Sequence, residues 1–214
     1  MQAIWPEDQT TDDPTFRVQW ARIVEGLRKA GLPDEPTAAK AHLVRAEVLA
    51  SNGHASEALK EAEAVIADDP NNAEARGLAG YVKMYLGRGE EGVADLETAL
   101  RLSPNDKRVP AWLGRLCYLE TKVGNWEAGI EWCEKAIAAG TPEKSWVLSQ
   151  LAGAYSWLGR DNEAKDAVAR LHDLDPHFTV QTYLTNAETR DNPTYRAQAT
   201  RAAEGLRKAG VPEE

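Results

Sequence analysis

The sequence has little of several features that mark common classes of protein. Two of its 214 residues are cysteines, and a disulfide-stapled secreted domain usually carries more. Residues 1–8 show no basic region followed by an apolar run, as a signal peptide would. No stretch approaches the roughly 18 apolar residues of a membrane-spanning helix. We therefore expect a cytoplasmic protein in a reducing compartment, without a membrane partner.

Positive charge is also scarce. The formal net charge is -9, and an acidic surface repels phosphate backbones unless a separate basic face offsets it. The short basic clusters are Arg28-Lys29 and Arg207-Lys208. Both stand at the ends of predicted helices, where cations complement the helix dipole. We interpret them as helix ends and expect no nucleic-acid partner.

Motifs of catalysis and metal binding are missing. No two of the four histidines stand three or four residues apart, the spacing that places two metal ligands on one helix face. The sequence holds no His-Glu-x-x-His, no glycine-rich phosphate loop and no Gly-x-Ser-x-Gly. We therefore expect no catalytic residues, no cofactor and no metal site, so the chain is predicted not to be an enzyme.

The sequence does contain an internal repeat of about 34 residues. Gly53, Gly87, Gly124 and Gly159 are 34, 37 and 35 residues apart, and each lies between two helix-like stretches. A small residue stands five positions after each of these glycines, where two helices would have to cross closely. Glycine tolerates the positive φ of a tight turn, and proline after the second stretch stops the helix. The pattern predicts stacked helix hairpins, each covering the apolar face of the one before it.

These residues resemble the tetratricopeptide-repeat (TPR) family, and four copies match its consensus, at about 39–72, 73–106, 110–143 and 145–178. The second copy has Gly80, Gly87, Gly92, Ala99 and Pro104, and the fourth has Leu151, Tyr155, Gly159, Ala164 and Pro176. The third copy carries extra residues in the loop at 105–110. The resemblance implies an all-α fold: a TPR-type α-solenoid of four helix hairpins with extra N- and C-terminal helices.

The resemblance also implies a binding surface, because the family binds partners in a concave groove lined by the first helix of each repeat. By register, the groove positions that we expect to contact a partner are Tyr81, Tyr85, Tyr118, Lys122, Trp146 and Trp157. Aromatic side chains supply much of the binding energy at interfaces. Some of these aromatics could instead belong to the core between repeats, and both interpretations stay open. If Tyr85 and Tyr118 line the groove, replacing either with Ala should abolish partner binding with little change in thermal midpoint.

Two further pairs of residues give structural expectations. Cys117 and Cys133 fall at inner positions of the two helices of the third repeat, so they should lie close together; paired inert core residues are favoured over a redox couple. Lys83 and Glu120 stand at equivalent positions of consecutive repeats where the family prefers tyrosine. We expect them to form an ion pair between repeats, the alternative being that each reaches solvent independently.

A second duplication is unrelated to the repeat. Residues 14–35 and 193–214 are identical at 14 of 22 positions, and each predicts one helix that ends in Ala-Gly-x-Pro. The second copy stands where a repeat array needs a capping helix over 193–209. The first copy has a bulkier apolar stripe, which either packs locally on the first repeat or takes a cap-like site on another molecule, giving a homodimer through the N-terminal helix.

The C-terminal copy resembles the closing segment of bacterial class III adenylate/guanylate cyclases that carry TPR repeats. The matching residues are Phe178-Thr179-Val180, Asn192-Pro193 and the run from Gly205 to Pro212. No cyclase catalytic domain is present in the sequence, so the resemblance implies a regulatory setting rather than an activity.

Taken together, the sequence predicts three parts: an N-terminal segment with one amphipathic helix (1–37), four repeats (38–178) and a C-terminal capping segment (179–214). The function that we predict is a protein–protein interaction scaffold or adaptor, which binds a peptide or partner protein in the groove. The alternative is a regulatory or assembly module of a bacterial nucleotide-cyclase-type signalling system.

Overall fold

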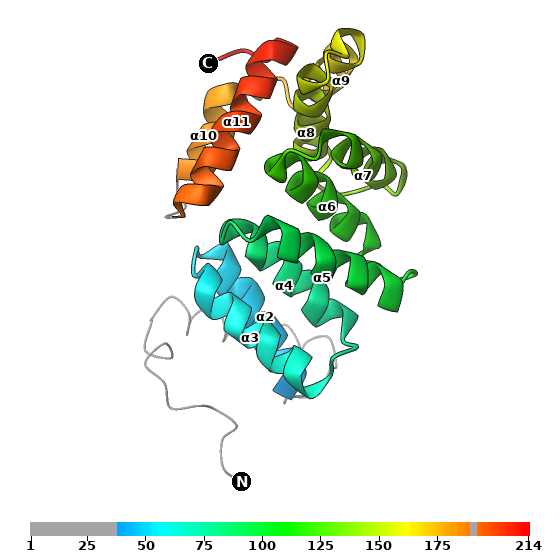
Figure 1. Ribbon diagram of the computed structural model, residues 1–214, viewed down its shortest axis with the longest axis vertical. Coiled ribbons are helices and arrows are strands. Elements are labelled where there is room, and N and C mark those ends of the chain that lie inside the picture. Colours follow the sequence, from blue (N-terminus) through cyan, green and yellow to red (C-terminus); the bar gives the residue numbers. More distant parts are fainter. Residues whose placement is uncertain (1–37, 189–191) are drawn as a thin grey trace.

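The computed structural model describes residues 38–188 and 192–214, and all regular secondary structure in these ranges is helical (Figure 1). Eight helices form four consecutive hairpins: α2 (Ala38–Ser51) with α3 (Ala55–Asp68), α4 (Ala73–Tyr85) with α5 (Gly89–Leu102), α6 (Val109–Val123) with α7 (Trp126–Ala138), and α8 (Lys144–Trp157) with α9 (Asp161–Leu174). Each hairpin packs on the next, so the predicted α-solenoid of four helix hairpins is confirmed. The predicted N-terminal helix lies outside the described residues.

The turns within the hairpins depend on the four repeating glycines. Gly53, Gly87, Gly124 and Gly159 have φ angles of 88°, 69°, 96° and 70°. An L-amino acid with a side chain rarely adopts this left-handed conformation, so glycine is the residue that lets the chain reverse within a few residues. The conformation predicted for these positions is confirmed.

The helices of a hairpin cross where both side chains are small. A Cβ atom added to Gly80 of α4 would lie 2.7 Å from the carbonyl oxygen of Gly92 on α5, and one added to Gly92 would lie 2.9 Å from the Gly80 carbonyl. The third hairpin has a related contact, in which Gly129 of α7 lies against the Thr121 side chain of α6, 2.6 Å from where a Cβ would stand. Larger residues at these crossings would force the helices apart.

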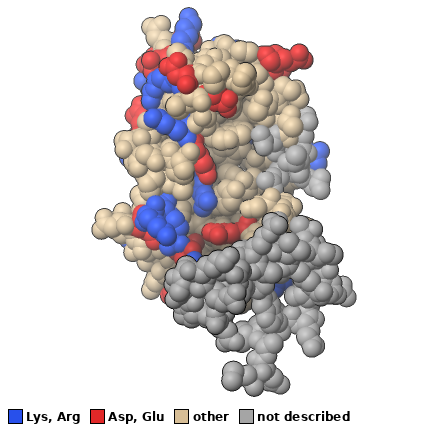
Figure 2. All heavy atoms as spheres, turned by 180° about the vertical axis from the view of Figure 1, so that it is seen from behind, with Lys and Arg blue, Asp and Glu red and all other residues tan. Residues whose placement is uncertain are grey.

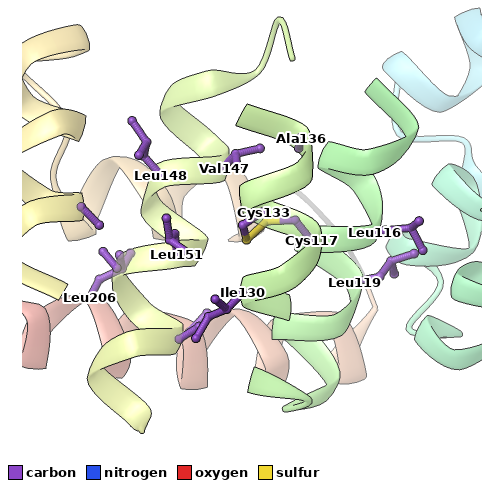
Figure 3. Packing of buried hydrophobic residues seen from close by; sticks show 14 of the residues in the cluster. Leu116, Cys117, Leu119, Ile130, Cys133, Ala136, Val147, Leu148, Leu151 and Leu206 are labelled. Atoms are coloured by element: carbon purple, nitrogen blue, oxygen red, sulfur yellow. A yellow bond between two sulfur atoms is a disulfide. The ribbon is translucent and has the colours of Figure 1, made fainter. Parts of the chain in front are cut away.

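Packing between hairpins buries the large apolar residues. Trp112 of α6 is 1% exposed and lies over Gly77 of α4, which has no side chain to obstruct the indole. Figure 3 shows the centre of the main core, where residues of α6, α7 and α8 interlock and Leu206 of α11 reaches the same cluster. The core is therefore continuous from the repeats into the C-terminal helix.

Cys117 of α6 and Cys133 of α7 lie side by side in this core and are joined by a disulfide (Figure 3). Both residues are fully buried. Their predicted proximity is confirmed. The sequence analysis did not predict the bond itself, which links the two helices of the third hairpin.

The predicted ion pair between Lys83 and Glu120 is wrong. The Lys83 ammonium lies 2.6 Å from the Asp95 carboxylate of α5, within its own hairpin, whereas the Glu120 carboxylate accepts a hydrogen bond of 2.7 Å from Asn125. Neither side chain reaches solvent freely, since Lys83 is 12% exposed and Glu120 is buried. Equivalent register therefore did not make these residues neighbours, because each turns toward the partner that its own hairpin offers.

The C-terminal segment holds two helices where the sequence analysis predicted one. α10 (Val180–Glu188) and α11 (Pro193–Ala209) pack against each other, and α11 also packs against α8, α6 and α9. The Val180 and Gln181 amides donate to the Pro212 and Glu213 carbonyls, at 2.9 and 3.1 Å, which ties the chain end to the start of α10. We call this unit the α10–α11 hairpin. No helix in the described ranges is long and apolar enough to cross a membrane.

Candidate functional site

The six residues predicted to contact a partner come from the first helices of three hairpins. Tyr81 and Tyr85 lie on α4, Tyr118 and Lys122 on α6, and Trp146 and Trp157 on α8. We call the surface that they define the inner face. The structure brings these residues together on one side of the solenoid, and the α10–α11 hairpin packs on that same side.

α11 runs across the C-terminal ends of all three helices and makes a polar contact at each. The Asn192 amide at its start donates to the Leu86 carbonyl at the end of α4, at 3.0 Å. Arg201 donates to the Lys122 carbonyl on α6, and the Trp157 indole of α8 donates to the Arg201 carbonyl at 3.3 Å. The inner face of the last three repeats is therefore already covered in part by a helix of the same chain.

Lys122 is buried by this arrangement. The residue is 1% exposed, and its ammonium lies 4.9, 4.7 and 5.5 Å from the ring centroids of Tyr118, Tyr183 and Tyr195. Nζ has no hydrogen-bond partner in the described structure. Burial, assisted by the positive charge of Arg201, lowers the pKa of Lys122 well below its ordinary value. A partner cannot reach this ammonium while the α10–α11 hairpin is docked.

The two tryptophans of the predicted set are also engaged within the chain. The Trp146 ring packs on Phe178 and Tyr183, with centroids 5.9 and 5.5 Å apart. Trp157 stacks on Trp126 with centroids 5.6 Å apart, and the Lys208 ammonium lies 3.5 Å from its ring centroid. Trp146 and Trp157 therefore pack within the chain, and their contact with a partner stays a prediction.

A pocket of about 270 Å³ remains open between α4, α6 and α8. Four of the six predicted residues line it, namely Tyr81, Tyr85, Tyr118 and Trp146. Tyr195 of α11 closes one side and shares a hydrogen bond of 2.8 Å with the Tyr118 hydroxyl. Lys122 and Trp157 lie outside the pocket lining, so the predicted set divides into four pocket residues and two covered ones.

Arg115 gives the pocket a positive charge that sequence reasoning missed. Its guanidinium carbon lies 4.0 Å from the Tyr81 ring centroid, and Arg115 lines the pocket with the tyrosines. Nε of Arg115 is buried without a hydrogen-bond partner, and none of the described carboxylates forms an ion pair with it. The only sequence signal was an arginine next to groove positions on a first helix. An aromatic pocket with an uncompensated guanidinium suits a partner group that is flat or apolar and next to a negative charge.

Charges elsewhere are more evenly paired. Figure 2 shows, on the rear face, Lys and Arg side chains interleaved with Asp and Glu along one edge of the described surface. Within the described ranges, no group of three or more His, Cys, Asp or Glu side chains is placed to hold a metal ion.

Stacked helix hairpins with a glycine at each turn define an α-solenoid, and comparisons with known proteins place it more closely. The family model described as "Tetratricopeptide repeat" matches residues 78–143. Residues 78–143 are therefore similar to tetratricopeptide repeats.

One curated relative is the TPR repeat-containing thioredoxin TTL4 of Arabidopsis thaliana, 27% identical over 147 residues. The match covers 63% of this chain and spans 20% of the length of that relative.

Solved structures share the fold. A MamA crystal structure has a TM-score of 0.55 at 19% identity, over 77% of this chain and 93% of that one. YrrB, described as a TPR protein with an unusual peptide-binding site, has a TM-score of 0.54 at 20% identity, over 78% and 82%. The repeats of a putative kinesin light chain from Podosopora anserina have a TM-score of 0.55 at 16% identity, over 82% and 96%. These likenesses establish the fold of the chain.

Proposed function

We propose that the chain is a protein-interaction scaffold and that it binds a segment of a partner protein in the pocket of the inner face. The observation that supports this most is Arg115, which lies over Tyr81 among aromatic walls with its Nε unpartnered. Aromatic residues and arginine are the side chains that most often dominate binding energy at protein interfaces. The pocket offers both in one concave place.

The charges around the pocket narrow the class of partner. Arg115 favours a carboxylate on the incoming segment, and the tyrosine and tryptophan rings favour an apolar or aromatic side chain beside it. Glu143 stands at the pocket edge and would repel a second carboxylate nearby. We therefore propose a segment that carries one acidic residue next to an aromatic or aliphatic anchor.

The alternative function, a regulatory or assembly module of a nucleotide-cyclase system, is supported only by the C-terminal sequence resemblance. Two residues of that resemblance have structural roles here. Phe178 packs on Trp146, and Gly205 lies against Trp157 where any side chain would collide. These two residues therefore help to dock the α10–α11 hairpin, and their presence gives no separate support to a regulatory function.

The experiment that tests the scaffold proposal is a comparative pull-down from the native host, with bound proteins identified by mass spectrometry. The bait is used in three forms: the unchanged chain, the variant Arg115→Gln, and the control Arg170→Gln, which alters an exposed arginine on α9. A partner of the pocket should be retained by the unchanged chain and the control and lost by Arg115→Gln. Identical sets of proteins on all three baits would contradict the proposal.

A further inference from the structure

The contact between α11 and the inner face depends on a few residues at defined positions, and we call the surface beneath it the α11 seat. Gly205 lies against Trp157, where an added Cβ would come 2.7 Å from the indole nitrogen. Lys208 covers the other part of the same indole, and Arg201 binds the Lys122 carbonyl. Leu206 is buried at 1% exposure between these contacts.

The chain carries this set of contact residues twice. Residues 14–35 repeat residues 193–214, and the identities include residues that contact the α11 seat, whereas the buried positions Tyr195, Ala199, Ala202 and Ala203 differ. The equivalent residues are Arg22 for Arg201, Gly26 for Gly205, Leu27 for Leu206 and Lys29 for Lys208. Residues 14–35 lie outside the described residues, but their sequence contains what the seat recognises in α11. The chain therefore contains two segments that share these contact residues, and the described residues contain one α11 seat.

The two segments differ mainly in the bulk of the apolar stripe. Buried Ala199, Ala202 and Ala203 of α11 correspond to Trp20, Ile23 and Val24 in the first segment. α11 is packed between α8 on one side and α10 on the other. If the α10–α11 hairpin leaves as a unit, the space of α10 becomes free beside the seat for those larger side chains that face it. At the Ala202 position, which lies with Gly153 and Trp157 of α8, the larger side chain requires α8 to move outward. The larger side chains would bury more apolar surface than the alanines do.

The geometry of the chain decides which molecule can supply the first segment. Its last residue, Glu35, is joined to the start of α2 by two residues only, a link that spans at most about 11 Å. The C-terminal end of the seat lies on α8, where the Lys208 ammonium covers the Trp157 ring. α2 packs on α3 and α4, and α8 lies beyond α4 and α6, so at about 8–10 Å per packed helix the gap is about 25 Å. Figure 1 shows α2 and the C-terminal end of α11 at opposite ends of the solenoid.

We therefore propose that residues 14–35 of one molecule bind the α11 seat of a second molecule and displace its α11. The partner class is thus a second copy of this chain, and the interaction goes beyond the pocket of the proposed function because it needs neither Arg115 nor an outside protein. The chain's own α11 competes at a high effective concentration, so the exchange depends on protein concentration.

Two matched substitutions test the exchange in the full chain, because equivalent glycines should have opposite effects. Gly26→Val should prevent the incoming segment from binding the seat and should therefore abolish self-association. Gly205→Val should weaken the docking of α11 on its own seat. The seat is then free, and the concentration needed for association should fall about tenfold or more. The measurement is the molar mass by light scattering over a concentration series, where the unchanged chain should approach twice 23.5 kDa. General destabilisation of the protein would move both variants in the same direction.

Two controls complete the test. Glu25→Gln changes the counterpart of exposed Glu204 and should associate like the unchanged chain. The double variant Gly26→Val/Gly205→Val should be a monomer with the helical circular dichroism of the parent. The proposal is overturned if the unchanged chain stays at 23.5 kDa at every concentration, if Gly26→Val still associates, or if the double variant associates as Gly205→Val does. None of these readouts involves a partner of the pocket, so failure here is distinct from failure of the scaffold proposal.

Discussion

Gly205 of α11 and Trp157 of α8 are in such close contact that no side chain fits between them. A Cβ on Gly205 would lie 2.7 Å from the indole nitrogen of Trp157 and 3.0 Å from the Gly153 carbonyl. The neighbouring turn of α11 is held by the same indole, which donates to the Arg201 carbonyl. One tryptophan thus fixes both the distance and the register of the C-terminal helix.

This contact predicts the effect of a single methyl group. Gly205→Ala should lower the free energy of unfolding by about 1–3 kcal/mol, the usual cost of overpacking, although alanine is the better helix former. Urea unfolding followed by circular dichroism measures the change. In a Trp157→Ala background the same substitution should cost less, since the ring is gone and only the Gly153 carbonyl, 3.0 Å from the added Cβ, still limits the space. Equal costs in the two backgrounds would mean that the indole does not set the limit at Gly205.

Lys122 predicts a dependence of stability on pH. Its pKa is lowered in the folded protein by burial and by Arg201, whereas the unfolded chain takes up a proton near the ordinary value of 10.5. The unfolded state therefore binds more protons between the lowered pKa and pH 10.5, and stability should rise with pH in that window. Burial raises the pKa of Tyr118 and Tyr183, so their contribution is lost only as pH rises above about 10.

The substitution that checks this is Lys122→Met, which keeps the length of the side chain without its amine. Urea unfolding of both proteins at a series of pH values below 9.5 should show a rising free energy for the parent and a flatter one for the variant. At neutral pH the variant should be at least as stable, because an amine without a hydrogen-bond partner is no longer buried. Parallel curves for the two proteins would count against a lowered pKa for Lys122.

Asp95 on α5 is the centre of a largely buried ionic cluster, and it is the partner of Lys83 in place of the predicted Glu120. Its carboxylate lies 2.6 Å from the Lys83 ammonium and 3.0 Å from the Arg76 guanidinium, and its side chain is 8% exposed. Asp95→Ala should cost up to about 3–5 kcal/mol because it removes the close partner of a largely buried ammonium and leaves only the exposed Glu91 carboxylate, 3.9 Å away. A double-mutant cycle should find coupling between Lys83 and Asp95 and none between Lys83 and Glu120.

The fold was predictable from the sequence because the repeat signals are local. Turn glycines and the small residues at helix crossings recur at a fixed spacing in the sequence. The roles of Gly87 and of the Gly80–Gly92 pair could therefore be predicted without a structure. The partner of Lys83 could not, because register gives the position of a residue along a helix and not the neighbour to which a flexible side chain turns. α10 was missed because its nine residues carry no repeat signal.

The candidate site was predictable only in part, for a related physical reason. Register placed Tyr81, Tyr85, Tyr118 and Trp146 around one pocket, but it could not show that the chain covers Lys122 and Trp157 with its own α10–α11 hairpin. The alanine-rich stripe of α11 indicated close packing without indicating which helices it packs on. That choice depends on contacts with residues far earlier in the chain, such as those of Arg201 with Lys122 and of Asn192 with Leu86.

Substitutions of Tyr85 and Tyr118 are predicted to have different effects on stability and on binding. Tyr85 is partly buried at the pocket, with its ring tilted against Tyr195 at 5.7 Å, whereas Tyr118 also shares a hydrogen bond with the Tyr195 hydroxyl and borders the Lys122 ammonium. Tyr118→Phe should therefore cost about 0.5–1.5 kcal/mol of unfolding free energy through the lost hydrogen bond, while keeping the aromatic wall.

Tyr85→Ala should weaken binding of a pocket partner by more than 1 kcal/mol, as an interface anchor does, and should lower the thermal midpoint less than Tyr118→Ala. Calorimetric titration and thermal unfolding of the three variants give both quantities. If Tyr85→Ala unfolds at the lower temperature and binds normally, Tyr85 belongs to the core and the pocket is not where a partner binds.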